Sequence, residues 1–123
     1  MIYFDNAATT KNKPAEVIDA VVNAMKNFGN SSRGVHEESL SADRIVFETR
    51  KKLAKMFNVG NSRQVVFTKN ATESLNISIN GLFLENDHII TSVSEHNSVL
   101  RPLHYLKEKG VEVSYIGVSE KGV

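Results

Sequence analysis

The stretch "FTKNATESLN", residues 67–76, decides the fold because it places a helix start directly after an apolar, β-branched run. Asn70 is a residue type that N-caps favour, and Glu73 follows it at the spacing of a capping box. The preceding run "QVVFT", residues 64–68, has the composition of a buried strand. The sequence therefore predicts a strand that turns abruptly into a helix.

The same alternation continues along the rest of the chain. The apolar patterns predict a helix over 72–83, a strand over 88–93, a helix over 97–109 and a strand over 111–116. Strands that alternate with helices through short links are typical of βαβ units, so we expect an α/β fold with three parallel strands. Such a sheet needs both faces covered, and no closing helix follows the last strand. We expect the chain to be the front part of a longer protein.

Two helices are expected before the first strand. One follows Pro14, which suits a first helical turn, and it stops at Gly29. The other carries an apolar stripe at helical spacing: Ala42, Val46, Leu53 and Phe57. We therefore expect an N-terminal arm over residues 1–12 and an incomplete N-terminal part of a domain over residues 13–123.

Composition narrows the class of protein. The chain has 123 residues, 41% hydrophobic and 24% charged, which is typical of a globular domain. Its formal charge of +1 is spread along the chain, so neither nucleic acid nor an anionic membrane is the expected partner. There is no cysteine for a disulfide or a thiolate zinc site. Without a leader or a membrane-spanning run, a cytoplasmic location is expected.

The helix start at Asn70 has two interpretations. Capping by Asn70 and Glu73 explains it without a ligand. The start also follows the carboxyl end of a predicted parallel strand, where free N–H groups and the helix dipole favour an anion such as phosphate. Ala71 allows a close approach there, and Thr72 adds a hydroxyl donor. The local sequence leaves both interpretations open.

His96, in "SVSEHNSVL" (residues 92–100), occupies the same position one βα unit later. We expect it near the helix start at Asn70–Thr72 if the two strands are neighbours. Its imidazole could stack on a planar cofactor, move a proton or bind a metal, or it could simply cap the following helix. No second histidine or carboxylate stands at metal-ligand spacing from His96, so no metal is expected.

Two further stretches are unusual. The loop "NSSRGVHEES", residues 30–39, carries Arg33 and His36, which could project into a cleft or belong to a solvated connector. "YFDNAATT", residues 3–10, forms a tight polar turn after an apolar pair, where a frayed end would need no such order.

Four motifs in this order, "YFDNAATT", "NSSRGVH", "VVFTKNATESLN" and "SEHNSVL", resemble the N-terminal part of the cysteine desulfurases. These enzymes belong to the class V aminotransferase group, which uses pyridoxal 5′-phosphate (PLP), and their relatives include selenocysteine lyases. The resemblance covers essentially the whole chain. It implies a PLP-dependent transferase fold in which residues 13–123 belong to the large PLP-binding domain.

The resemblance also implies a role for each motif. The helix start at Asn70, Ala71 and Thr72 holds the PLP phosphate, although many desulfurases have Gly where this chain has Asn70. His96 stacks on the pyridine ring and takes part in proton transfer. The remaining motifs lie on the substrate side, with four residues implied there: Ala7, Ala8, Arg33 and His36.

The implied activity is removal of sulfur from L-cysteine, which gives alanine and an enzyme persulfide. A homodimer, a sulfur-acceptor protein and a link to iron–sulfur cluster assembly are implied with it. The Schiff-base lysine and the nucleophilic cysteine are expected beyond residue 123, so this segment alone is expected to be inactive. The alternatives are a selenocysteine lyase or a non-catalytic phosphate- or nucleotide-binding α/β module. The chain lacks the glycine-rich fingerprint and P-loop typical of such modules.

Overall fold

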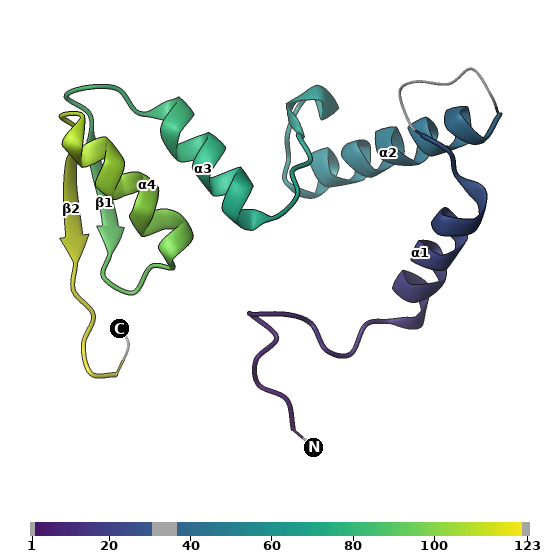
Figure 1. The fold of residues 1–123 in the computed structure, drawn as a ribbon, viewed down its shortest axis with the longest axis horizontal. Helices are drawn as coiled ribbons and strands as arrows, with labels where there is room; N and C mark the ends of the chain where they lie inside the picture. The colour runs from purple at the N-terminus through teal and green to yellow at the C-terminus, as the bar shows by residue number, and fades with distance from the viewer. Residues whose placement is uncertain (1, 31–36, 122–123) are drawn as a thin grey trace. The chain divides into compact units, whose positions relative to one another are not determined.

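The computed structural model describes residues 2–30 and 37–121, and the chain divides into two compact units, Met1–Val66 and Phe67–Val123. The described part of the first unit is helical, and the sheet belongs to the second (Figure 1). The elements follow one another as α1 (Ala15–Asn27), α2 (Glu37–Met56), η1 (Ser62–Gln64), α3 (Ala71–Leu82), β1 (His88–Ser92), α4 (Asn97–Glu108) and β2 (Glu112–Ile116).

Helix α1 begins after Pro14, as the sequence predicts. Glu16 in its first turn and Lys26 in its last turn both complement the helix dipole. No residue of α1 is buried. Its apolar stripe is therefore exposed among the described residues, and this stripe contains Val17, Val21 and Met25.

Helix α2 ends in a Schellman motif. Asn58 adopts a left-handed φ of 54°, the Val59 N–H donates to the Ala54 carbonyl at 2.7 Å, and the Asn58 N–H donates to the Lys55 carbonyl at 3.3 Å. The helix thus ends at "NVGNS", residues 58–62, and Asn58 is the left-handed residue of the motif. A glycine usually takes the left-handed position at a helix end, but Gly60 has no positive φ here and Asn58 takes that position instead.

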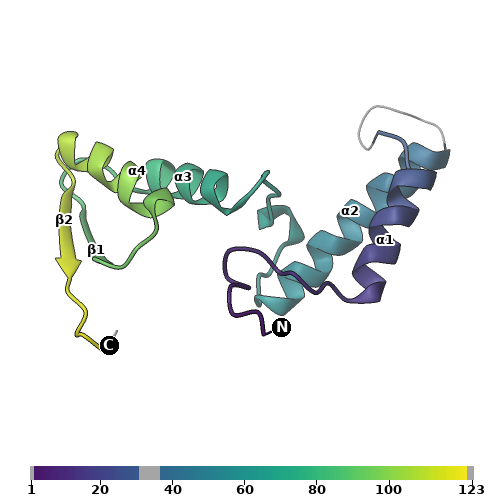
Figure 2. The ribbon, with the colours of Figure 1, turned by 60° about the horizontal axis from the view of Figure 1, so that its bottom comes forward.

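The second unit is a parallel α/β structure. β1 pairs with β2 in register from His88 opposite Glu112 to Ser92 opposite Ile116, and α4 connects the two strands. Both ribbon views show β1 and β2 side by side (Figure 2). The predicted α/β class with parallel strands is confirmed.

One face of this sheet packs on the helices. Alternation along the strands turns Ile89 and Val113 inward, whereas Ile90 is exposed on the other face. The buried cluster joins α3, α4 and both strands, and it contains Ile79, Ile89, Leu103, Leu106, Val111 and Val113. Leu103 is only 2% exposed. This core fixes the positions of α3 and α4 relative to β1.

The predicted strand over residues 64–68 is wrong. Gln64 closes a 3₁₀ turn, and the following backbone is extended but pairs with no strand in the described part of the chain. The sheet has two strands rather than three. An apolar, β-branched run favours extended backbone, but a strand also needs a neighbour for its N–H and C=O groups. Val66 is 73% exposed, and the boundary between the two units follows it.

A left-handed glycine ends α4. Gly110 has a φ of 91°, its N–H donates to the Lys107 carbonyl at 3.2 Å, and the Val111 N–H donates to the Leu106 carbonyl at 3.1 Å. This second Schellman motif turns the chain from α4 directly into β2. No helix within residues 2–30 and 37–121 is long and apolar enough to span a bilayer.

Candidate functional site

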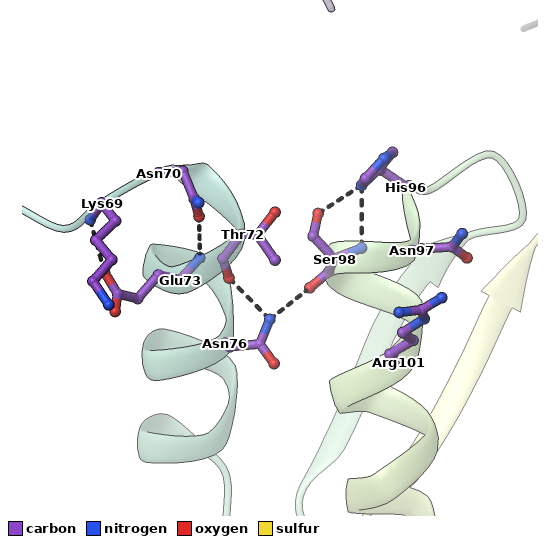
Figure 3. A pocket seen from close by; sticks show the side chains of 9 residues that line it. All are labelled: Lys69, Asn70, Thr72, Glu73, Asn76, His96, Asn97, Ser98 and Arg101. Carbon is purple, nitrogen blue, oxygen red and sulfur yellow. Dashed lines mark hydrogen bonds between the residues drawn. The ribbon is translucent and has the colours of Figure 1, made fainter.

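A pocket of about 730 Å³ lies where α3 and α4 begin, within the second unit. The two helices run in the same direction with their N-termini at the same end of the pair (Figure 3). Because α4 follows β1 in the chain, the pocket lies beyond the carboxyl end of that strand, where α/β sheets commonly bind ligands. Its lining residues are Lys69, Asn70, Thr72, Glu73, Asn76, His96, Asn97, Ser98 and Arg101.

Side-chain hydrogen bonds fix the start of α3. Asn70 Oδ1 accepts a hydrogen bond from the Glu73 N–H at 2.9 Å, so Asn70 is the predicted N-cap. Glu73 Oε2 in turn accepts from the Lys69 N–H at 2.7 Å, one residue earlier than in a standard capping box. The Thr68 hydroxyl donates to the Asn70 carbonyl at 3.0 Å. The helix therefore has a defined first residue, Ala71.

Two backbone donors remain in the first turn of α3 itself. The Asn70 side chain occupies the Glu73 N–H, and the Asn70 carbonyl accepts from the Ser74 N–H at 3.2 Å. The N–H groups of Ala71 and Thr72 have no hydrogen-bond acceptor within the described residues of this unit. Unpaired N–H groups at the positive end of a helix dipole favour an anion.

His96 is the N-cap of α4. Its Nδ1 accepts a hydrogen bond from the Ser98 N–H at 3.1 Å and lies 2.9 Å from Ser98 Oγ. A backbone N–H can only donate, so Nδ1 is unprotonated in this geometry and the neutral ring has its proton on Nε2. The capping role considered for His96 is therefore the one found, and the capping ring also lines the pocket.

Asn76 connects the two helix starts. Its Nδ2 donates to the Thr72 carbonyl at 2.9 Å and reaches the Ser98 carbonyl at 3.5 Å (Figure 3). The side chain thus spans from the α3 turn that carries Thr72 to the α4 turn that His96 caps. This contact adds a polar link to the apolar packing between α3 and α4.

The charges of the pocket are mostly positive. Lys69 and Arg101 contribute two cations to its lining, and Glu73 contributes one carboxylate. That carboxylate already accepts the Lys69 N–H. The two cations and the two unpaired N–H groups of α3 together favour a small anionic group.

The structure brings the central predicted residues together. Asn70, Thr72 and His96 line one pocket, and Ala71 begins the helix beside it. The predicted strand 64–68 contributes nothing to this convergence, which depends on the packing of α3 against α4. Sequence reasoning missed five lining residues: Lys69, Asn76, Asn97, Ser98 and Arg101.

The predicted substrate-side residues belong elsewhere in the chain. Ala7 and Ala8 are exposed in a turn of the first unit, where the Thr9 N–H donates to the Asp5 carbonyl at 3.3 Å. The predicted tight turn is thus present. Arg33 and His36 lie outside the described residues.

The other described histidines have structural partners. His88 Nε2 lies 2.8 Å from Ser114 Oγ across the strand pair, and His104 lies 3.5 Å from a Glu108 carboxylate oxygen on the exposed side of α4. Among the residues that the structure describes, no group of three or more His, Asp or Glu side chains is placed to hold a metal ion.

Residues 2–123 match the family model for aminotransferase class-V, and the chain belongs to this family. The cysteine desulfurase IscS 1 of Archaeoglobus fulgidus is 37% identical over 129 residues, which cover 99% of this chain and 32% of that protein. The cysteine desulfurase IscS of Rickettsia akari is 35% identical and is covered to 30%. The chain thus spans about a third of the length of these relatives.

A solved structure has a similar fold. The apo cysteine desulfurase from Thermococcus onnurineus NA1 matches with a TM-score of 0.79 and 36% sequence identity. The match covers 94% of this chain and 30% of that one. The backbone of this chain is therefore similar to that of part of a much longer protein.

Proposed function

We propose that the chain is the N-terminal segment of a PLP-dependent cysteine desulfurase and that the pocket between the starts of α3 and α4 is its cofactor site. One observation carries the proposal: the unpaired N–H groups of Ala71 and Thr72 and the ring of His96 meet at one pocket. The family match and the cysteine desulfurases among the relatives support the proposal.

The pocket residues fit PLP in two respects. A phosphate dianion needs several donors, and α3 offers two backbone N–H groups and the Thr72 hydroxyl. Lys69, before α3, and Arg101, on α4, add two cations to the pocket. A pyridine ring needs a flat partner, and the His96 imidazole is the aromatic side chain among the lining residues. Glu73 opposes the phosphate by charge, but its carboxylate is bonded to the Lys69 N–H.

This chain would hold and orient the cofactor. Asn70 keeps its side chain on the Glu73 N–H, which leaves the first two N–H groups of α3 for the phosphate. His96 would cover one face of the ring and handle a proton at Nε2. PLP itself supplies the electron sink that makes bonds to an amino acid's carbon atoms labile.

The remaining chemistry needs groups outside these residues. A desulfurase needs a thiolate to take the sulfur, and the chain contains no cysteine. We propose that the nucleophilic cysteine and the lysine that binds PLP covalently belong to the remainder of the enzyme. The substrate-side roles of Ala7, Ala8, Arg33 and His36 also stay predictions, because their placement against the pocket is not described.

Three wider properties complete the proposal: the complete enzyme is a homodimer, it passes sulfur to an acceptor protein, and it acts in the cytoplasm. The exposed apolar stripe of α1 supports the first, because apolar stripes of this kind are usually covered in an assembled protein. Sedimentation of the complete enzyme tests the dimer. A sulfur-transfer assay with candidate acceptor proteins tests the transfer of sulfur, and cell fractionation tests the cytoplasmic location.

The decisive experiment uses the complete enzyme that carries residues 1–123. We expect its absorbance spectrum to show bound PLP and borohydride to change that spectrum. With an added thiol reductant that releases the persulfide sulfur as sulfide, L-cysteine should yield sulfide and alanine. The isolated 123-residue chain is the control and should release no sulfide, because it has no thiolate. If the complete enzyme binds PLP but produces neither sulfide nor alanine, the family assignment holds and the desulfurase proposal fails.

A further inference from the structure

We propose that the Ser98 hydroxyl is a positioning group for His96, and that it allows the ring to keep its place in both tautomers. Ser98 makes two contacts with one ring nitrogen, because both its N–H and its Oγ lie within hydrogen-bond distance of His96 Nδ1. Ser98 is buried, so water does not readily replace this hydroxyl.

The two contacts differ in the protonation states of Nδ1 that they allow. The Ser98 N–H can only donate, so it bonds Nδ1 only when Nδ1 carries no proton. The hydroxyl can donate to an unprotonated Nδ1 and, after rotation about its C–O bond, accept from a protonated one. Ser98 Oγ is thus a partner for either protonation state of Nδ1.

This difference decides what the other ring nitrogen can do. With Nδ1 unprotonated, the neutral ring carries its proton on Nε2 and can only donate from there. A base at Nε2 requires the proton on Nδ1, and that proton needs an acceptor. Ser98 Oγ, 2.9 Å away, can accept that proton, and the bond from the Ser98 N–H to Nδ1 is then given up.

The proton balance follows directly. When Nδ1–H is bonded to Ser98 Oγ, Nε2 has a free electron pair that accepts a proton from a substrate. The ring then becomes an imidazolium with both nitrogens protonated, and it returns to the neutral form when Nε2 gives that proton back. The Ser98 hydroxyl accepts from Nδ1–H throughout and itself neither gains nor loses a proton.

Charged side chains lie in the same pocket as His96, but Ser98 is the residue that hydrogen-bonds to Nδ1. The charged side chains that line the same pocket are Lys69 and Glu73 from the start of α3 and Arg101 from α4, and Glu95 precedes the ring in the chain. Within the described part of the chain, the hydrogen bonds of His96 Nδ1 go to Ser98.

The test compares Ser98→Thr with Ser98→Val in the complete enzyme. The two side chains have nearly the same shape, so the pair differs in the hydroxyl while any crowding from the added carbon is shared. Both keep the backbone N–H that His96 Nδ1 caps. Ser98→Ala adds a variant without crowding if the larger side chains disturb the buried position.

The first readout is the tautomer of His96 from ring ¹⁵N chemical shifts, measured without substrate at alkaline pH. His96→Asn identifies the His96 signal among the histidines of the complete enzyme. We expect the Nδ1–H tautomer to be populated in the parent and Ser98→Thr enzymes and lost in Ser98→Val and Ser98→Ala. Equal tautomer populations in all four would overturn the proposal.

The second readout is turnover, and this arm rests on the proposed desulfurase function. We expect kcat to fall about 10–100-fold in Ser98→Val and Ser98→Ala, a range typical for loss of a group that orients a functional histidine, with near-parent kcat in Ser98→Thr. A tautomer change with unchanged kcat would also overturn the proposal. Absence of any reaction with L-cysteine in the parent enzyme would instead refute the proposed function, while the tautomer measurement would still decide the role of Ser98.

Discussion

The Asn76 side chain lies across the seam between α3 and α4, with its Nδ2 3.5 Å from the Ser98 carbonyl oxygen. The same amide nitrogen donates to the Thr72 carbonyl at 2.9 Å. One neutral side chain thus links the helix that offers unpaired N–H groups to the helix that His96 caps. In the cofactor site proposed above, the distance between these two helix starts would decide whether a phosphate and a ring can be held at once.

Replacing Asn76 by Asp should weaken cofactor binding. A carboxylate loses the donor to both carbonyls and adds a negative charge to the pocket proposed for the phosphate. We expect PLP affinity to fall by about tenfold, or roughly 1.4 kcal/mol, as measured by titration of the complete apoenzyme.

Asn80→Asp is the matched control. Asn80 makes the same local bond one turn later, to the Asn76 carbonyl at 2.8 Å, but it does not line this pocket. Its PLP affinity should stay near that of the parent. Equal losses in the two variants would assign the effect to general destabilisation of α3.

Thr72→Val should weaken PLP binding because it removes a hydroxyl from the lining of the pocket while keeping the size of the side chain. A donor to a charged phosphate oxygen contributes about 1.5–3 kcal/mol, which corresponds to roughly 10- to 150-fold in the dissociation constant. Thr72→Ser retains the hydroxyl and should bind PLP almost as the parent does. An unchanged dissociation constant in Thr72→Val would remove this side chain from the proposed phosphate site.

The sequence predicts the second unit better than the segment before it. The helix starts at Asn70 and His96 depend on local hydrogen bonds, so spacing alone locates them. The strand over 64–68 depends on a neighbour that the sequence does not specify, and the structure leaves that segment unpaired. The local hydrogen bonds and the parallel pair of β1 and β2 were therefore predictable, and the absence of a pairing partner for residues 64–68 was not.

The pocket was only partly predictable for a related reason. Thr72 and Asn76 are four residues apart on one helix, so their shared face could be inferred from helical spacing. Ser98 follows His96 by two residues, the offset at which a capping side chain meets a backbone N–H. Arg101 joins the lining through the packing of α4 on α3, which no local pattern encodes.

Two glycine substitutions should change stability in opposite directions. Gly110→Ala forces a side chain onto a φ of 91° and brings its Cβ within 3.2 Å of Glu85 Cγ, so it should destabilise the fold by about 1–2 kcal/mol. Gly81→Ala lies within α3 with no atom within 4 Å of the added Cβ, so it should stabilise by about 0.5–1 kcal/mol. Urea denaturation measures both, and a stabilising Gly110→Ala would contradict the Schellman geometry at the end of α4.

Three substitutions at His96 should separate its capping, stacking and proton-transfer roles. His96→Asn keeps an excellent N-cap and removes the ring, His96→Phe keeps a ring without a cap or an ionisable nitrogen, and His96→Ala removes all three properties. We expect the Phe and Ala variants to lose about 0.5–2 kcal/mol of stability from the missing cap, with the Asn variant close to the parent.

PLP affinity should follow the ring instead, so it should be retained in His96→Phe and reduced in His96→Asn and His96→Ala. Turnover should fall by about 10²–10⁴-fold in all three, the usual range for loss of a positioned acid–base group. Unfolding curves, PLP titration and sulfide release from L-cysteine measure the three properties on the same preparations. Parent-like turnover in His96→Asn would leave His96 as a helix cap alone.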